Sequence, residues 1–338
     1  MDQVQIREIQ AQFLRKIEDV LPKNTTLVNE LADLLKISTD SAYRRMRGET
    51  LLVLDEILML SERFKVSFDT YAHKQEGWVA FRYLKLNPTR DSFKTYLLAM
   101  LRDLRVIAEA PQRTITYACE DIPVFHHYRH PLMAQFKMFY WMHAIMGVPE
   151  LESDKFDAER IDEELSSIGL QIIEQYSAVP SVEIWTETTI QSTVKQIAFF
   201  WESGKFREKA DALAVCNSLR DEIVTIQKQA EQSSKRREEG PRNDSEANNY
   251  QLYYSEIEIT NNCVLVDMGT VSSVYLGHFS FSTMSTTSES YCAETRKWFE
   301  VIRRKSALIS GVSEKQRYQV FKKYFNQIND LEQSILNS

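Results

Sequence analysis

The chain has 338 residues, a formal net charge of −7 at pH 7, and 43% hydrophobic residues. Its 9 glycines and 8 prolines are about half of the usual share, and so few helix-breaking residues favour long helices. No apolar run approaches the roughly 18 residues that a membrane-spanning helix needs, and the polar N-terminus (MDQVQIREIQ) lacks a secretory signal pattern, so we expect neither a membrane protein nor a secreted one.

Cysteine spacing bears on metal binding and on the cellular compartment. The four cysteines are Cys119, Cys216, Cys263 and Cys292, and none belongs to a Cys-x-x-Cys pair. Their spacing indicates neither a zinc site nor a disulfide framework. We therefore expect a cytoplasmic protein without a metal or another cofactor.

The N-terminal region predicts short helices. Apolar residues recur every three or four positions over residues 3–21, which predicts an amphipathic helix that ends before Pro22. Three further helices separated by tight turns are expected between residues 25 and 69. Ser38 or Thr39 is placed to cap the second of these, and Gly48 to end it, because glycine adopts the left-handed conformation without steric cost. A helix, a short turn and an Arg-rich helix form the helix-turn-helix pattern.

This stretch resembles the lambda-repressor-like (Cro/C1-type, XRE) family of helix-turn-helix proteins. The matching pieces are LVNELADLL, the Ile37-Ser38 turn, the helix that ends at Arg47-Gly48, and the closing KVSFDTY. The resemblance ends after Tyr71 and implies that the helix from Thr39 to Arg47 enters the major groove of double-stranded DNA. It implies a base contact for Arg44 and a phosphate contact for Arg47. The full set of expected DNA-binding residues is Thr39, Asp40, Ser41, Tyr43, Arg44, Arg45 and Arg47.

Two positions depart from the family pattern. Lys36 stands where the family often has glycine, and Arg45 stands where an apolar residue usually packs. Placing Ala42 and Met46 inward repairs the packing and leaves Arg44 outward.

The charge of the region leaves DNA binding open. Residues 1–72 carry ten Lys and Arg against twelve Asp and Glu, a net of −2, whereas nonspecific nucleic-acid binders are basic. Two alternatives therefore stand beside DNA binding. One is an ordinary helical hairpin with a solvated Arg face, and the other is a protein-interaction or scaffold module whose helix-turn-helix does not bind DNA.

Beyond this region the pattern stays mainly helical. Helical periodicity or start signals mark residues 93–107, the segment from Pro131, and residues 158–176, 190–201 and 206–230. TITYACEDIPVFHHY alternates weakly and is interpreted as a short extended stretch. Residues 231–249 are polar and predict a linker.

The C-terminal third changes character. Residues 250–282 alternate in polarity and are rich in Tyr, Val, Ile and Phe, which predicts three strands, and two helices follow at 289–309 and 313–335. The predicted fold class is therefore mainly α. We expect a DNA-binding domain at 1–72, a helical dimerisation or sensor domain at 73–230, and a small α+β domain with an antiparallel sheet at 250–338.

Four of the six histidines cluster in the middle of the chain: His126, His127, His130 and His143. Glu120 and Asp121 precede them, and large aromatic residues are interspersed among them. A pocket with an apolar floor and a few polar groups has this composition, so we predict an effector site. Its expected residues are His126, His130, Tyr140 and His143. The alternative is an inert core edge with hydrogen-bonded histidines. The HExxH order of zinc proteases is absent.

Other motifs do not indicate an enzyme, because GxSxG, GxxxxGK[ST] and GxGxxG are missing. The remainder of the chain loosely resembles uncharacterised parts of large bacterial helix-turn-helix regulators, best in WFEVIRRKSALISGVSEKQR, and this resemblance implies no catalytic residue. We expect a sequence-specific transcriptional regulator. We also expect it to act as a homodimer, because one small helix-turn-helix reads only a few base pairs. A small-molecule effector of unknown identity is compatible with this interpretation.

Overall fold

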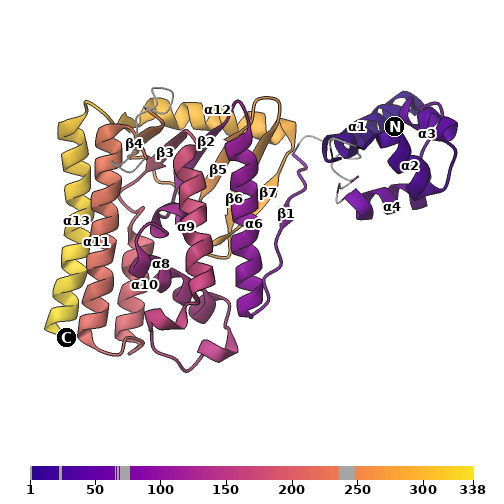
Figure 1. Ribbon diagram of the computed structural model, residues 1–338. Coiled ribbons are helices and arrows are strands. Elements are labelled where there is room, and N and C mark those ends of the chain that lie inside the picture. Colours follow the sequence, from indigo (N-terminus) through magenta and orange to yellow (C-terminus); the bar gives the residue numbers. More distant parts are fainter. Residues whose placement is uncertain (1, 23–24, 65, 67, 69–76, 236–247) are drawn as a thin grey trace. The chain divides into compact units, whose positions relative to one another are not determined.

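The computed structural model describes residues 2–22, 25–64, 66, 68, 77–235 and 248–338. The chain divides into two compact units, Met1–Ala80 and Phe81–Ser338. Both contain the helices that the scarcity of glycine and proline favours (Figure 1). Within the described residues, no helix is both long enough and apolar enough to cross a membrane.

The first unit contains the helices expected from the sequence. They are α1 (Gln3–Asp19), α2 (Leu27–Leu35), α3 (Thr39–Met46) and α4 (Leu54–Phe64). A capping box starts α1, because the Asp2 carboxylate accepts from the Gln5 amide while the Gln5 side chain accepts from the Asp2 amide. The buried core of the unit is formed by Phe13, Leu14, Ile17, Leu27, Val28, Leu31, Ala42, Leu52, Leu60 and Val66.

Helix α4 buries fewer residues than its sequence suggests. Leu60 is fully buried, but the apolar residues Leu54 and Leu58 are 72% and 61% exposed. A narrow stripe is sufficient here because the helix has only 11 residues and packs at the edge of a small core. Part of the closing KVSFDTY segment lies outside the described residues, although Phe68 packs edge-on against Phe13 with ring centroids 5.2 Å apart.

The second unit is built on an eight-stranded mixed sheet, counted over its described residues. The strands are β1 (Arg82–Tyr83), β2 (Thr114–Cys119), β3 (Ser181–Trp185), β4 (Tyr250–Tyr254), β5 (Cys263–Asp267), β6 (Ser272–His278), β7 (Ser282–Thr286) and β8 (Ala307–Leu308). Their order is β1-β7-β6-β5-β2-β3-β4-β8. Strands β2, β3 and β4 are parallel, and every other neighbouring pair is antiparallel.

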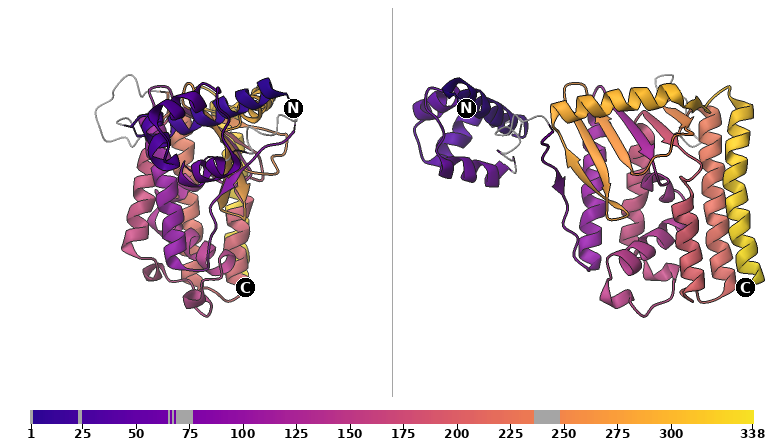
Figure 2. Two further views of the ribbon diagram at one scale, coloured as in Figure 1. Left: turned by 90° about the vertical axis from the view of Figure 1, so that its right-hand side faces the viewer. Right: turned by 180° about the vertical axis from the view of Figure 1, so that it is seen from behind.

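Most of the helices of this unit cover one face of the sheet, where α6 packs on α9 and α11 packs on α13 (Figures 1 and 2). This layer contains α6 (Arg90–Glu109), α7 (Val124–His127), α8 (Pro131–Tyr140), α9 (Glu163–Ala178), α10 (Gln191–Glu202), α11 (Lys209–Gln232) and α13 (Glu314–Asn337). A π-helical turn, η1 (Trp141–Ile145), extends α8, and short 3-10 turns lie at Pro149–Leu151 and Ala158–Arg160. Helix α12 (Glu289–Lys305) packs on the opposite face against β5 and β6.

Alternation along the strands separates two cores. In β5, Val264 and Val266 belong to the large core under the main helical layer, whereas Leu265 belongs to the smaller core under α12. In β3, Trp185 faces the large core and Ile184 the smaller one. The sheet is therefore covered on both faces, as is usual where strands are parallel.

The sheet corrects the predicted domain division and sheet type. Strands β4 to β7 do not form a separate antiparallel domain, because β4 pairs in parallel with β3 and β5 pairs with β2. Residues 81–338 therefore form one unit. The expected linker at 231–249 is also shorter than predicted: α11 continues to Gln232, while Lys235 and Asn249 are buried. Residues 236–247 lie outside the described part of the chain.

Candidate functional site

The turn between α2 and α3 has the geometry that its residues predict. Lys36 ends α2 in the left-handed conformation with φ of 56°, and the Ser38 hydroxyl accepts from the Ser41 amide at 3.2 Å, so Ser38 is the N-cap of α3. Gly48 follows α3 with φ of 71°, where a side chain would be strained. The predicted cap and helix end are therefore confirmed.

Helix α3 presents a polar face to solvent. Ala42 is buried and Met46 is half-buried, as the inward placement of these two residues requires. The residues on the other side are exposed, apart from the half-buried Ser41: Thr39, Asp40, Tyr43, Arg44 and Arg47. Six of the seven residues that the family resemblance assigns to DNA are thus free of the core.

Arg45 is the exception, because its guanidinium is bound to Glu56 on α4. Arg45 Nη2 lies 2.7 Å from Glu56 Oε1, and Arg45 Nε donates to both carboxylate oxygens at 3.0 and 3.1 Å. The two side chains are only 15% and 11% exposed. Glu56 also accepts from the Val53 amide at 3.1 Å, at the start of α4. Arg45 therefore joins α3 to α4, and its expected DNA contact is corrected to a structural ion pair.

Glu49 contacts the two exposed arginines of this face. Its carboxylate lies 2.6 Å from Arg47 Nε and 3.7 Å from Arg44 Nε. The hydrogen bond to Arg47 lowers the pKa of Glu49. All three side chains are about half exposed, and exposed ion pairs contribute little. A phosphate can therefore replace Glu49 as the partner of either guanidinium.

Gln10 connects α1 to the segment after α3. This buried amide donates to the carbonyl oxygens of Arg45 at 2.8 Å and Thr50 at 2.9 Å, and its oxygen accepts from the Leu52 amide at 2.7 Å. These bonds satisfy backbone groups in the last turn of α3 and in the irregular segment that follows it. They fix the end of α3, and with it the orientation of the exposed arginine face.

The second unit encloses a cavity of about 300 Å³ between α6 and the antiparallel half of the sheet. Its walls are largely apolar, and its aromatic members are Tyr83, Tyr96, Tyr117, Phe125, Trp141, Tyr275 and Phe281. The exposed residues Arg82 and Arg102 also line it, so it reaches the surface on that side. A mostly apolar cavity of this size with a few polar groups is typical of a small-molecule site.

The polar residue of greatest interest in this cavity is Lys137 on α8. The side chain is 2% exposed, and its ammonium donates to Thr193 Oγ1 at 3.1 Å and to Gln196 Oε1 at 2.7 Å. Both acceptors are neutral, and the ion pairs found among the described residues include none to Lys137. Burial lowers the pKa of Lys137 to about 8, although the charges of Asp121 and Glu222 act in the opposite direction. Lys137 is thus a buried cation without a contacting counter-charge.

Asp121 lies at the same cavity, directly after the carboxyl end of β2. The side chain of Asn262 positions this turn by accepting from the amides of Glu120 and Asp121 at 3.0 and 3.2 Å. Asp121 Oδ1 is buried and has no hydrogen-bond partner among the described residues. A buried carboxylate oxygen without a donor is costly, so a donor from a ligand would be favourable at this position.

His127 on α7 also lines the cavity, and its Nδ1 lies 2.9 Å from Glu222 Oε1 on α11. Burial lowers the pKa of His127 well below its usual value and raises the pKa of Glu222 to about 7. Both shifts favour the uncharged forms, so the pair joins α7 to α11 without placing a full charge beside Lys137.

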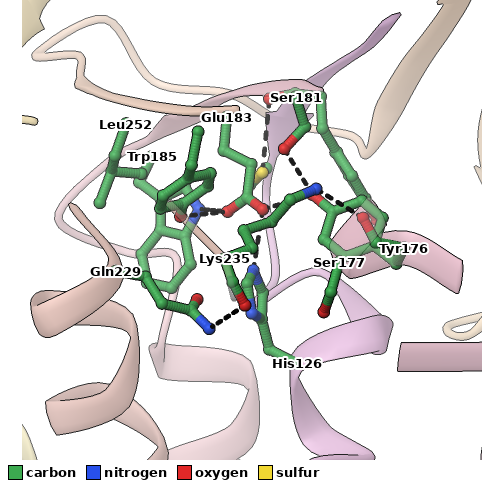
Figure 3. Close-up of polar contacts among 12 residues, drawn as sticks. His126, Tyr176, Ser177, Ser181, Glu183, Trp185, Gln229, Lys235 and Leu252 are labelled. Atoms are coloured by element: carbon green, nitrogen blue, oxygen red, sulfur yellow. Dashed lines mark hydrogen bonds and ion pairs between the residues drawn. The ribbon is translucent and has the colours of Figure 1, made fainter. Parts of the chain in front are cut away.

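A separate polar network surrounds Glu183 on β3 (Figure 3). This fully buried carboxylate accepts from His126 Nε2 at 2.8 Å, Tyr176 at 2.5 Å, Trp185 Nε1 at 2.8 Å and Tyr250 at 3.0 Å. Burial alone would raise its pKa, but the charge and hydrogen bond of His126, the Tyr176 hydrogen bond and the charge of Lys235 together outweigh burial and lower the pKa to about 2.

Lys235 belongs to the same network, where it caps α9. Its ammonium donates to the carbonyl oxygens of Tyr176 and Val179, each at 2.7 Å, and lies 3.6 Å from the centre of the Tyr176 ring. A cation at the carboxyl end of a helix satisfies free carbonyls and complements the helix dipole. Every member of the network is thus engaged in joining β3, α7, α9 and β4, which indicates a structural role.

The predicted effector residues do not surround the cavity. His126 is committed to Glu183, and His143 stacks on Phe139 with ring centroids 5.5 Å apart. His130 and Tyr140 are half-buried, and neither they nor the first two are among the residues that line the cavity. The same stretch instead supplies Asp121, Phe125, His127, Lys137 and Trp141.

One signal in the sequence could have identified the site. Lys137 is the only Lys, Arg, Asp or Glu in the largely apolar run LMAQFKMFYWMHAIMG, and such a residue in a buried helix needs a polar partner.

Comparisons with protein-family models, with curated proteins and with solved structures found no match to this chain. The described residues contain no group of three or more His, Cys, Asp or Glu placed to hold a metal ion. The four cysteines are buried and free.

Proposed function

We propose that this protein is a cytoplasmic, sequence-specific DNA-binding transcriptional regulator of the lambda-repressor-like type, in which α3 enters the major groove. The observation that carries the proposal is the Ser38-capped helix that follows a tight turn and presents Thr39, Asp40, Tyr43, Arg44 and Arg47 to solvent. Helices of this length and placement can reach base edges, while exposed guanidiniums can bind bases or phosphates.

The second unit supports a sensing role in the proposed regulator. Its cavity is lined by Arg82, Tyr83 and Leu84, which follow almost directly after the end of the first unit at Ala80. A ligand bound there would contact the chain segment that leads to the proposed DNA-binding unit. We also propose a homodimer, because two linked readers recognise a palindromic site that one reader cannot specify.

The proposal is tested by selecting DNA from a random pool with the full chain and measuring binding by fluorescence anisotropy. Arg44→Ala should weaken binding by about 1–3 kcal/mol and relax sequence preference, as expected for a base contact. Arg47→Ala should weaken binding to all DNA sequences alike and reduce the salt dependence of the affinity. Arg15→Ala removes an exposed charge from α1 and is the matched control.

Glu49 provides a test in the opposite direction. Glu49→Gln removes the carboxylate that faces Arg44 and Arg47, so it should raise DNA affinity several-fold at low salt. If no sequence is enriched from the pool, and Arg44→Ala, Arg47→Ala and Glu49→Gln all leave DNA binding unchanged, the protein-interaction alternative is favoured. The net charge of −2 in the first 72 residues also suits that alternative. Light scattering that shows a monomer with and without DNA would refute the homodimer.

A further inference from the structure

Two polar groups that line the cavity of the second unit lack partners of the kind that burial requires. Lys137 has neutral acceptors but no contacting carboxylate, and Asp121 Oδ1 has no donor among the described residues. Both residues line the same cavity, and the charge of Asp121 opposes the lowering of the Lys137 pKa. The remaining lining is mostly aliphatic and aromatic.

These observations define the chemistry of a ligand. Its anionic group would provide the counter-charge for Lys137, and a charge-assisted hydrogen bond in a buried site is among the stronger polar contacts. A donor close to that anion would satisfy Asp121. An apolar body would fill the space beside Tyr96, Phe125 and Trp141, where burial of apolar surface supplies most of the affinity.

We propose that this cavity binds an apolar α-amino acid or α-hydroxy acid, with the carboxylate at Lys137, the α-substituent at Asp121 and the side chain against the aromatic wall. The site deepens the proposed function, since it gives the sensing unit a class of ligand. Binding is measured on the full chain without DNA, so its failure is distinguishable from a failure of DNA recognition.

Other groups near Lys137 set the electrostatics of the site. Thr193 and Gln196 on α10 are neutral acceptors, and burial lowers the pKa of His127 while it raises the pKa of Glu222 to about 7, so this pair contributes negative rather than positive charge near Lys137. Lys137 is therefore the main cation in the polar region, opposed by Asp121. Two exposed cations, Arg82 and Arg102, line the surface side of the cavity, and the anionic Asp103 lies there with them.

The test uses isothermal titration calorimetry with four matched probes. L-phenylalanine and 3-phenyllactate carry both the carboxylate and the α-donor. The probe 3-phenylpropionate lacks the α-donor, and L-phenylalaninamide lacks the carboxylate. We expect the first two to bind with Kd of about 1 mM or tighter, and the amide to bind about 10- to 100-fold more weakly.

Variants assign the contacts. Lys137→Met should weaken binding of the carboxylate probes about 10- to 100-fold. Lys195 is an exposed lysine on α10, and Lys195→Met should leave their binding unchanged. Asp121→Asn should reduce the preference for 3-phenyllactate over 3-phenylpropionate without abolishing binding of the latter. Ala99→Phe, which fills the cavity from α6 and leaves the polar region intact, should block all probes.

A second readout follows from the lowered pKa of Lys137. A carboxylate partner raises the pKa of this ammonium, so binding of 3-phenyllactate at pH 8.5 should take up protons, seen as a binding heat that depends on the ionisation enthalpy of the buffer. Lys137→Met should abolish this uptake. The proposal is overturned if no probe binds, if the amide binds as well as the acid, or if Lys137→Met and Lys195→Met behave alike.

Discussion

Gln10 offers the sharpest test of how the first unit is held together. Its side chain makes hydrogen bonds to three backbone groups between Arg45 and Leu52. Gln10→Met keeps the side-chain volume but removes all three bonds. The two bonds to carbonyl oxygens contribute about 1 kcal/mol net each, and the buried Leu52 amide, left unpaired, costs about 1–3 kcal/mol. We therefore expect a loss of roughly 3–5 kcal/mol in the free energy of opening this unit.

Hydrogen exchange of the full chain, followed by mass spectrometry, measures this loss in peptides from α1, α3 and α4. Protection should fall in all of them for Gln10→Met, because the small core opens as a unit. Gln12→Met, a half-buried position on the same helix, should leave exchange unchanged. If the free energy of opening measured for Gln10→Met lies within about 0.5 kcal/mol of the wild-type value, the assigned role is refuted, since even one lost buried bond exceeds that difference.

Two other ion pairs, Arg45–Glu56 and His126–Glu183, give predictions about the stability of the two units. Arg45→Met should destabilise the first unit by about 2 kcal/mol or more because it leaves the Glu56 carboxylate without its partner, and Arg45→Met with Glu56→Met should recover part of that loss in the same exchange measurement. Glu183 has a folded pKa of about 2, below its ordinary value of 4.5, so its stabilising contribution is fully present above pH 4.5 and is lost as the pH falls toward 2. The shift corresponds to roughly 3 kcal/mol, and Glu183→Gln should remove this part of the pH dependence. Urea unfolding followed by near-UV circular dichroism at pH 5.5, 4.5 and 3.5 tests it, and parallel curves for variant and wild type would contradict it.

Local chemistry explains what the sequence predicted well. The cap at Ser38, the end of α3 at Gly48 and the starts of α12 and α13 depend on residues a few positions apart, whereas α12 ends at Lys305, four residues before its predicted end. Arg45 and Glu56 lie 11 residues apart on different helices, so the pattern around Arg45 contains no sign of its partner. The expected DNA contact of Arg45 fails for this reason.

Strand β3 shows a second kind of limit. SVEIW is five residues long, is buried at every position and contains a glutamate, so it lacks the alternation that marks a half-exposed strand. Its neighbours in the sheet, β2 and β4, are separated from it by long helical segments. Periodicity therefore predicted β4, β5 and β6 as strands and missed β7, and it contained no information that these strands would join the middle of the chain.

The histidine cluster illustrates how burial decides between similar residues. His126 and His127 are adjacent, yet one bonds to Glu183 and the other reaches the cavity, because successive positions of α7 face different neighbours. No spacing rule separates them. Lys137 differs, since a lone charge in an apolar helix needs a polar environment wherever the helix packs.

The edge of the sheet relates the cavity to the rest of the molecule. Strand β1 pairs with β7 at only two positions, Arg82 with Ser285 and Tyr83 with Met284, whereas β2 has five paired positions on each side. Elements with few pairings open at lower free energy than central strands. A ligand in the cavity would contact Tyr83 and Leu84, so it would stabilise one of the two weakly paired edges of the sheet. Strand β1 is also the segment through which the chain arrives from the first unit. If the ligand binds more tightly when β1 is paired than when it is unpaired, then by linkage the bound ligand shifts the pairing equilibrium of β1 by the same free energy.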